Sequence, residues 1–198
     1  SKSESDGEIY SFSNGLSSDN LEILEIPNFG SAMDRFKTDE AARVRWTFDG
    51  QEISKSGVRA MAQASAEAIE KSGLSKDDVD IFIPHQANIR IVEALEKKLG
   101  LPNATTIKKV HRYGNTSAAS IPTAFVDALE EGEIKGGEIA VFTAVGAGLA
   151  WGACAVRLGD RVTPINKSDA KLPDFDGTAT DTIKKAIEYQ VPDKLDKI

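Results

Sequence analysis

Short apolar runs alternate with helical apolar patterns along the middle of the chain, and this alternation constrains the fold more than any other feature. Residues 79–84, 139–145 and 149–158 are apolar runs of strand length. Residues 58–69 and 91–99 instead carry apolar side chains every three or four positions, which is the spacing of one helix face. An alternating order of strands and helices is typical of a layered α/β domain, which we predict here.

The segments around these elements add a hairpin, a third helix and two short strands. The last two apolar runs are joined by Gly-Ala-Gly at residues 146–148, and so short a link predicts an antiparallel hairpin. Residues 116–131 carry a helical pattern, so Pro122 must lie in the first turns of that helix or kink it. Alternating side chains at residues 21–26 and 43–48 predict two short strands.

The composition excludes several classes of protein. The chain has 198 residues, 40% of them hydrophobic, and a net charge of −7. Disordered chains are poorer in apolar residues and nucleic-acid-binding domains are usually basic, so neither class is expected. A single cysteine, Cys154, excludes an intrachain disulfide and favours a reducing, cytoplasmic setting. The first residues lack the pattern of a secretion signal and no apolar run is long enough to span a membrane, so we expect neither.

The pattern divides the chain into three parts. We expect residues 1–50 to be a connector with leading strands, residues 51–158 to be the α/β domain, and residues 159–198 to be an appended, partly ordered tail. The tail contains prolines and charges of both signs, and a weak helical pattern is confined to residues 180–191.

Two polar clusters lie where a predicted strand leads into a predicted helix. His85 follows the strand at residues 79–84 and opens the sequence His-Gln-Ala-Asn, whereas Asn115 precedes the helix at residues 116–131. Such junctions are where open α/β sheets place ligand-binding and catalytic groups. Each residue also has a purely structural alternative. His85 could cap a helix or satisfy a buried carbonyl, and Asn115 could be the N-cap of the third helix.

Other chemistry has less support in the sequence. With one cysteine and two separated histidines, His85 and His111, a metal site is not expected. No Gly-x-Gly-x-x-Gly segment precedes a helix, so a nucleotide site is not expected either. Cys154 lies in an apolar strand without a nearby base, and we interpret it as a structural cysteine rather than a nucleophile. The glycines on either side of Ala147 allow the backbone to approach a ligand and present N–H groups to negative charge.

Three segments together resemble the β-ketoacyl-acyl-carrier-protein synthase III family, the initiating condensing enzymes of bacterial fatty-acid synthesis. The segments are IPHQANIR at residues 83–90, GNTSAASIP at residues 114–122 and GAGLAWG at residues 146–152. Their spacing also matches the family, and the likeness extends from Asp6 to Leu158. The resemblance implies the C-terminal half of a thiolase-like fold, in which a five-stranded mixed sheet is packed between helices.

The same resemblance implies roles for individual residues. His85 and Asn115 match the histidine and asparagine of a catalytic Cys-His-Asn triad. The remaining matches are Ala147, Asn88 and Gly146 for the oxyanion hole and support of the site, Gly50, Gln51 and Val145 for substrate binding, and Arg90 for docking of the carrier protein. Gln51 departs from the usual asparagine, and Val145 is smaller than the aromatic residue often found there. Arg90 has the alternative of an ordinary solvated charge on a helix.

The implied activity is decarboxylative condensation of an acyl thioester with malonyl-acyl-carrier protein. Coenzyme A or phosphopantetheine thioesters are the implied substrates, with no resident cofactor. The catalytic cysteine belongs to the N-terminal half of the family, which no segment here resembles. We therefore expect an N-terminal half as a separate chain or a cleaved segment, packed on the helices at residues 58–69 and 116–131. Acyl carrier protein is a further expected partner, and we expect a dimer of such pairs.

Two alternatives remain open at this point. The chain could be a non-catalytic partner subunit of a condensing heterodimer, which would stabilise or regulate a complete synthase. It could also belong to a related acyltransferase that uses a different acceptor. Neither nucleic acid nor a membrane is an expected partner.

Overall fold

The computed structural model describes residues 6–19, 21–25, 47–162 and 177–190. Its contacts divide the chain into two units, Ser1–Thr163 and Pro164–Ile198. The sheet and all candidate site residues belong to the first unit. The second unit contains helix α5 (Ala179–Gln190), which agrees with the helical pattern at residues 180–191.

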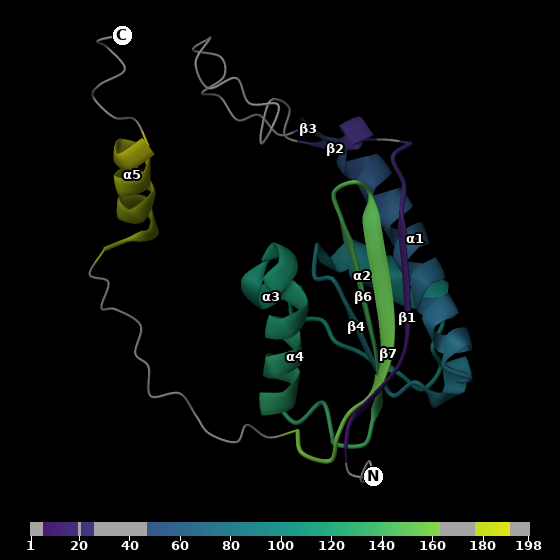
Figure 1. Ribbon diagram of the computed structural model, residues 1–198. Coiled ribbons are helices and arrows are strands. Elements are labelled where there is room, and N and C mark those ends of the chain that lie inside the picture. The colour runs from purple at the N-terminus through teal and green to yellow at the C-terminus, as the bar shows by residue number, and fades with distance from the viewer. Residues whose placement is uncertain (1–5, 20, 26–46, 163–176, 191–198) are drawn as a thin grey trace. The chain divides into compact units, whose positions relative to one another are not determined.

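A five-stranded mixed sheet forms the centre of the first unit (Figure 1). Its strands in spatial order are β1 (Glu8–Leu16), β7 (Ala150–Arg157), β6 (Ile139–Gly146), β4 (Ile81–Pro84) and β5 (Thr105–Thr106). β4 runs parallel to β5 and β6, whereas β7 is antiparallel to β6 and β1. The predicted α/β fold with a five-stranded mixed sheet is confirmed.

β6 and β7 form the predicted hairpin, next to a strand that is buried throughout. The register pairs Ile139 with Arg157 at one end and Gly146 with Ala150 at the other, and residues 147–149 form the turn. All four residues of β4 are buried, because strands flank it and helices cover both of its faces. This position explains why β4 is apolar at every residue rather than alternating.

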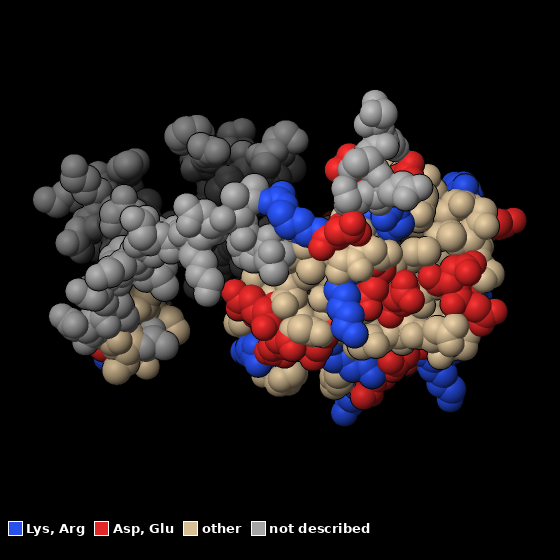
Figure 2. All heavy atoms as spheres, turned by 90° about the horizontal axis from the view of Figure 1, so that it is seen from below, with Lys and Arg blue, Asp and Glu red and all other residues tan. Residues whose placement is uncertain are grey.

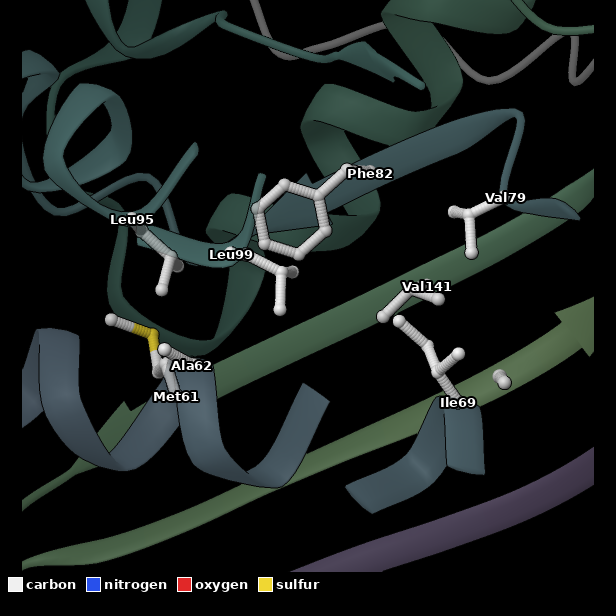
Figure 3. Close-up of a cluster of buried hydrophobic side chains, with 9 residues drawn as sticks. Met61, Ala62, Ile69, Val79, Phe82, Leu95, Leu99 and Val141 are labelled. Atoms are coloured by element: carbon white, nitrogen blue, oxygen red, sulfur yellow. The ribbon is translucent and has the colours of Figure 1, made fainter. Parts of the chain in front are cut away.

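One face of the sheet is covered by α1 (Gly50–Lys71) and α2 (Ile89–Leu99). α1 begins where the Asp49 carboxylate accepts hydrogen bonds from the backbone N–H groups of Gln51 and Glu52. α2 ends at Gly100, which has a left-handed φ of 60°. Figure 3 shows the core on this face, which consists of Met61, Ala62, Ile69, Val79, Phe82, Leu95, Leu99, Val141 and Ala155.

Small residues on α1 allow this helix to lie close to the sheet. Ala64 and Ala68 are buried with Ala153 of β7, and Trp151 packs against them. The outer side of α1 differs, because it presents polar side chains such as Gln63 to solvent. A second layer on α1, as predicted for the N-terminal half, would have to pack on this polar side.

α4 (Ser120–Glu130) covers the opposite face of the sheet (Figure 1). The core beneath it consists of Ile81, Ile83, Ile107, Ala124, Ala128, Ile134 and Ala140. The helix predicted over residues 116–131 is shorter than expected because Ser117 has a φ of 54°, which a right-handed α-helix does not tolerate. A 3-10 turn at Ser117–Ala119 precedes α4, and Pro122 lies in the first turn of α4 as predicted.

The two strands predicted near the start are only partly present. Leu21–Ile23 form a 3-10 helix, so the strand predicted at residues 21–26 was wrong over its first half. Only β2 (Leu24–Glu25) pairs with β3 (Thr47–Phe48). Residue 26 and residues 43–46 lie outside the described part of the chain. So short an apolar pattern does not distinguish a strand from a helical turn.

β1 was not predicted from the sequence, and Gly15 within it shows why. This glycine pairs with Trp151 of β7 in the antiparallel ladder. A Cβ at Gly15 would come within 2.5 Å of the Trp151 ring, so the ring lies directly against the glycine backbone. Glycine inside a strand commonly marks such a close approach, but in a sequence it resembles a turn.

The surface of the first unit carries charges of both signs. Figure 2, which views the molecule from below, shows acidic and basic side chains interspersed on this side of the unit. Within the described ranges, no helix is both long enough and apolar enough to cross a membrane.

Candidate active site

Six of the residues singled out in the sequence line one cavity of about 220 Å³. They are Gly50, His85, Asn88, Asn115, Val145 and Gly146. They come from the starts of α1 and α2, the ends of β4 and β6, and the loop before α4. The two strand-to-helix junctions that carry His85 and Asn115 follow the parallel strands β4 and β5 and converge on a single site, as the carboxyl ends of neighbouring parallel strands allow.

His85 directly follows β4, and two contacts determine its position. Its backbone N–H donates to the carbonyl of Thr143 at 2.8 Å, so the chain leaving β4 stays beside β6. Its ring Nδ1 lies 2.6 Å from Oγ of Ser120, the first residue of α4. Neither structural alternative holds for the side chain, because Asn88 caps α2 and the ring partner is a hydroxyl. Burial lowers the pKa of His85, so the imidazole is neutral near pH 7.

Asn115 is held by a turn of its own backbone rather than by α4. Its Oδ1 accepts a hydrogen bond from the backbone N–H of Ser117 at 2.9 Å. Asn115 is not the N-cap of α4, because Ala119 stands at that position. Since Ser117 N–H can only donate, the carboxamide oxygen must face it, and Nδ2 is the donor that remains for a ligand.

Asn88 has a structural task that also brings it to the site. Its backbone is extended, and its Oδ1 accepts a hydrogen bond from the backbone N–H of Ile91 at 3.0 Å as the N-cap of α2. The same side chain lines the cavity beside His85. Asn88 therefore fixes the start of α2 at the edge of the site.

Gln86 joins the two junctions, and the sequence did not single it out. Its side chain is 2% exposed. Nε2 donates to the carbonyls of Pro84 at 2.7 Å and Ile107 at 3.1 Å, while Oε1 accepts from the backbone N–H of Lys109 at 2.9 Å. These bonds tie the end of β4 to the segment that follows β5. A glutamine directly after a catalytic candidate was the available signal.

An ion-pair cluster on the preceding segment holds the start of the loop that contains Asn115. This loop follows the short helix α3 (Val110–Tyr113). Arg112 contacts Asp127 of α4 and Glu131, the C-cap residue of that helix, each at 2.8 Å. The Tyr113 hydroxyl donates to Asp127 at 3.0 Å. Hydrogen bonds from Lys109 and Arg112 lower the pKa of Glu131. These contacts hold α3 against α4, and they also fix the start of the loop that contains Asn115.

The end of the β6–β7 hairpin forms one wall of the cavity. Val145 and Gly146 line it, whereas Ala147 is exposed in the turn and is absent from the lining. Val145 packs on α1, where a Cβ added to Gly57 would lie 3.3 Å from one of its methyl groups. The structure therefore places Val145 and Gly146 beside His85 and leaves Ala147 at the rim of this wall.

Gln51 and Arg90 lie in a neighbouring groove rather than in the cavity. This groove has a volume of about 820 Å³ and runs between the first turns of α1 and α2. Ser54, Asn88 and Ile91 line both the groove and the cavity, so the two spaces adjoin. The structure thus separates the two predicted substrate-contact and docking residues from the histidine and asparagine.

Cys154 lies on β7 and does not line the cavity. Burial raises the pKa of its thiol, which disfavours the reactive thiolate. The interpretation of Cys154 as a structural cysteine agrees with this environment. Among the residues that the structure describes, no cluster of three or more histidine, cysteine, aspartate or glutamate side chains could hold a metal ion.

The fold of the first unit is that of the C-terminal half of a thiolase-like protein. Residues 69–158 match the family described as 3-oxoacyl-[acyl-carrier-protein] synthase III, C terminal. The chain is 47% identical over 177 residues to β-ketoacyl-[acyl-carrier-protein] synthase III 2 of Vibrio cholerae, a match that covers 88% of this chain and 48% of the relative.

Solved structures give the same result. The 3-oxoacyl-[acyl-carrier-protein] synthase III of Aquifex aeolicus is similar with a TM-score of 0.65 and 35% identity, covering 79% of this chain and 46% of that one. A priming β-ketosynthase of a polyketide biosynthetic pathway is similar with a TM-score of 0.70 and 30% identity, covering 77% and 45%. Residues 69–158 therefore correspond to the C-terminal region of the β-ketoacyl-acyl-carrier-protein synthase III family. The chain spans about half the length of the relatives that it matches.

Proposed function

We propose that this chain supplies the histidine and asparagine of a 3-oxoacyl-acyl-carrier-protein synthase III-like condensing enzyme, and that the catalytic cysteine comes from an N-terminal half. One observation carries the proposal. His85 and Asn115, from separate junctions, line the same cavity of about 220 Å³. The names of the relatives from V. cholerae and A. aeolicus support the class of reaction.

The reaction needs hydrogen-bond donors that carry no formal charge. In a decarboxylative condensation, the bond between the malonyl carboxylate and the methylene carbon breaks, carbon dioxide leaves, and the electron pair forms an enolate on the thioester oxygen. His85 would donate to that oxygen through Nε2 and Asn115 through Nδ2. Each donor of this kind lowers the barrier by about 3 to 4 kcal/mol.

The second step explains why a cysteine is needed. The enolate carbon attacks the carbonyl of an acyl group held on a cysteine, a carbon–carbon bond forms, and the thiolate leaves. Cys154 does not fit this role, because it lies outside the cavity and its thiol pKa is raised. The nucleophile must therefore be supplied by residues other than those described here.

An open apolar area beside α4 supports the position of the N-terminal half. Phe12 of β1 is 62% exposed. It lines a hollow of about 410 Å³ with Ile121, Phe142 and Cys154, on the part of the sheet that α4 leaves uncovered. Apolar hollows of this kind mark interaction surfaces. A helix packed beside α4 would bury it.

The open area continues to the proposed catalytic histidine. A second hollow of about 390 Å³ shares Ile121, Ala144 and Gly152 with the first, and it is lined by His85 and Ser120. A partner bound on this face can therefore bring its cysteine next to the His85 ring. We place the N-terminal half here, on α4, rather than on the polar outer side of α1.

The remaining residues receive roles from the same arrangement. Gly50 and Val145 line the cavity and would contact the substrate, and the backbone around Gly146 and Ala147 would present N–H groups to the oxyanion. The groove that holds Gln51 and Arg90 adjoins the cavity. We assign it to the arm of a coenzyme A or phosphopantetheine thioester, with Arg90 placed to meet an acidic carrier protein, and we assign no resident cofactor.

Reconstitution with a cysteine-bearing N-terminal half tests the proposal. His85→Ala should lower the rate of malonyl-thioester decarboxylation by about 100- to 1,000-fold, because one oxyanion donor is lost. Acylation of the partner cysteine, followed by mass spectrometry, should persist. His111→Ala is the matched control, because His111 is exposed on α3 and should leave both steps unchanged.

Four outcomes would contradict the proposal. Loss of both steps in His85→Ala, or of neither, would reject the assigned role. Unchanged turnover in Asn115→Ala would indicate a non-catalytic partner subunit. A product formed from an acceptor other than malonyl thioester, identified by mass spectrometry, would indicate a related acyltransferase of different specificity.

A further inference from the structure

We propose that Ser120 is a positioning residue that selects the His85 tautomer with its proton on Nε2, and so aims a neutral donor at the substrate. This inference rests on the proposed function for its catalytic meaning, but the tautomer itself is a property of this chain. Ser120 is 3% exposed and is the first residue of α4. Its Oγ lies 2.6 Å from Nδ1 of His85.

The proton count around Ser120 determines which atom donates. A serine hydroxyl has one proton to give and two lone pairs to accept with. One lone pair receives the backbone N–H of Gln86, at 3.2 Å. Among the described residues, the acceptor within hydrogen-bond distance of the Ser120 hydroxyl is Nδ1 of His85. Ser120 therefore donates to Nδ1.

The consequence for His85 follows from the imidazole ring. In the neutral ring one nitrogen accepts and the other carries the proton, so an accepting Nδ1 leaves the proton on Nε2. The opposite tautomer would leave the buried hydroxyl proton of Ser120 without an acceptor, which is unfavourable. Nε2–H is the group that must point at an enolate oxygen, and the Nδ1–H tautomer would present a lone pair there instead.

The surroundings of Ser120 keep this contact in place. Gln86, which donates to Ser120, is itself fixed by three side-chain hydrogen bonds to backbone atoms. The helix that begins at Ser120 packs on β4, the strand that His85 directly follows. The donor thus begins one element of this core, and its acceptor and second partner directly follow another. A positioning group on rigid elements holds a catalytic side chain more accurately than a group on a loop.

Nitrogen-15 spectra of the full chain, labelled at histidine, test the tautomer directly. The chain contains two histidines, so His111→Gln assigns the His85 ring signals without ambiguity. At neutral pH, we expect Nε2 of His85 to be protonated and Nδ1 to be an acceptor. Ser120→Ala should move both signals toward a mixture of tautomers, while Ser120→Thr, which keeps the hydroxyl, should restore the original pattern.

A matched serine provides the control for burial and volume. Ser65 is completely buried on α1 and its hydroxyl has no hydrogen-bond partner among the described residues. Ser65→Ala should therefore leave the His85 signals unchanged. A proton on Nδ1 of His85 in the unaltered chain overturns the proposal, and this measurement does not depend on the folding of any variant. An unchanged tautomer in Ser120→Ala also overturns it.

Activity separates this inference from the proposed function. In the reconstituted enzyme, Ser120→Ala should lower the kcat of decarboxylation by about 10- to 100-fold, the range found when groups that orient histidines at metal sites are removed. The KM and the acylation of the partner cysteine should change little. If the spectra show the predicted tautomers but the reconstituted enzyme does not condense, the proposed function fails and the role of Ser120 in setting the tautomer stands.

Discussion

The two faces of the sheet differ in how completely they are covered, and the difference separates stability from assembly. On one face, α1 and α2 bury a continuous core around Phe82, which is 1% exposed. On the other, α4 covers β4 and leaves Phe12 on β1 62% exposed. The covered face contributes a packed core, whereas the partly open face has hollows that extend to His85 and is where we propose that a partner binds.

Truncating a phenylalanine on each face should give the largest contrast. Phe82→Ala should lower the free energy of unfolding by about 3 to 5 kcal/mol, because it leaves a cavity in a packed core. Phe12→Ala should change the stability of the chain by less than about 1 kcal/mol, because the ring is mostly in solvent. Urea denaturation measures both values.

The same pair of variants tests the role of the open face. Phe12→Ala should weaken binding of the N-terminal half, which a titration of the partner measures, even though it spares the stability of this chain. Equal losses of stability in the two variants would show that the faces do not differ. Unchanged binding in Phe12→Ala would show that the partner does not bind on this face.

Gln86 connects the end of β4 to the segment before α3, so its removal should have an intermediate effect. Gln86→Leu should lower the free energy of unfolding by about 2 to 3 kcal/mol, because buried backbone groups at Ile107 and Lys109 lose their partners. Gln63→Leu is the matched control, because Gln63 is exposed on α1 and its loss should cost little. A similar change in both variants, measured by thermal denaturation, would contradict the structural role.

The pH dependence of stability should show the smallest effect. Burial lowers the pKa of His85 in the folded state below its usual value of 6.5. As the pH falls through 6.5, the unfolded chain binds a proton that the folded chain does not, so stability decreases until the lower folded pKa is reached. Carboxylates whose pKa is lowered in the folded state, such as Glu67, stabilise the fold at higher pH. Their contribution is lost mainly as the pH falls below 4.5. The region between pH 6.5 and 4.5 therefore isolates the histidine.

A variant without this ring provides the comparison for the pH measurement. His85→Gln should flatten the dependence between pH 6.5 and 4.5, whereas His111→Gln should retain it. Unfolding free energies measured at several pH values detect the difference. An unchanged slope in His85→Gln would show that the ring is not held neutral by burial.

Much of the fold could be predicted because its signals are local. The apolar run of β4, the period of α1 and the glycine-containing turn between β6 and β7 each follow from neighbouring residues, and all are confirmed. β1 was missed because its glycine is explained by Trp151, more than a hundred positions away. The start of α4 was misplaced because the spacing of apolar residues does not reveal that Ser117 has a left-handed φ.

The candidate site shows the same division. His85 and Asn115 could be chosen from residue type and from their place between a strand and a helix. Gln86 could not be given its role, because the partners of its side chain at Ile107 and Lys109 are far along the chain. Gln51 and Arg90 were each chosen through the family resemblance, for substrate binding and for docking, and only the structure shows that both line one groove beside the cavity.

The sequence by itself determined the order of strands and helices, the absence of an activated cysteine and the two polar junctions, because each depends on residues close together in the chain. Only the tertiary structure decided that the junctions share one cavity, that a serine hydroxyl meets Nδ1 of the histidine, and that part of one sheet face remains open. These properties depend on which distant segments pack side by side, and packing is a property of the whole core rather than of any one segment.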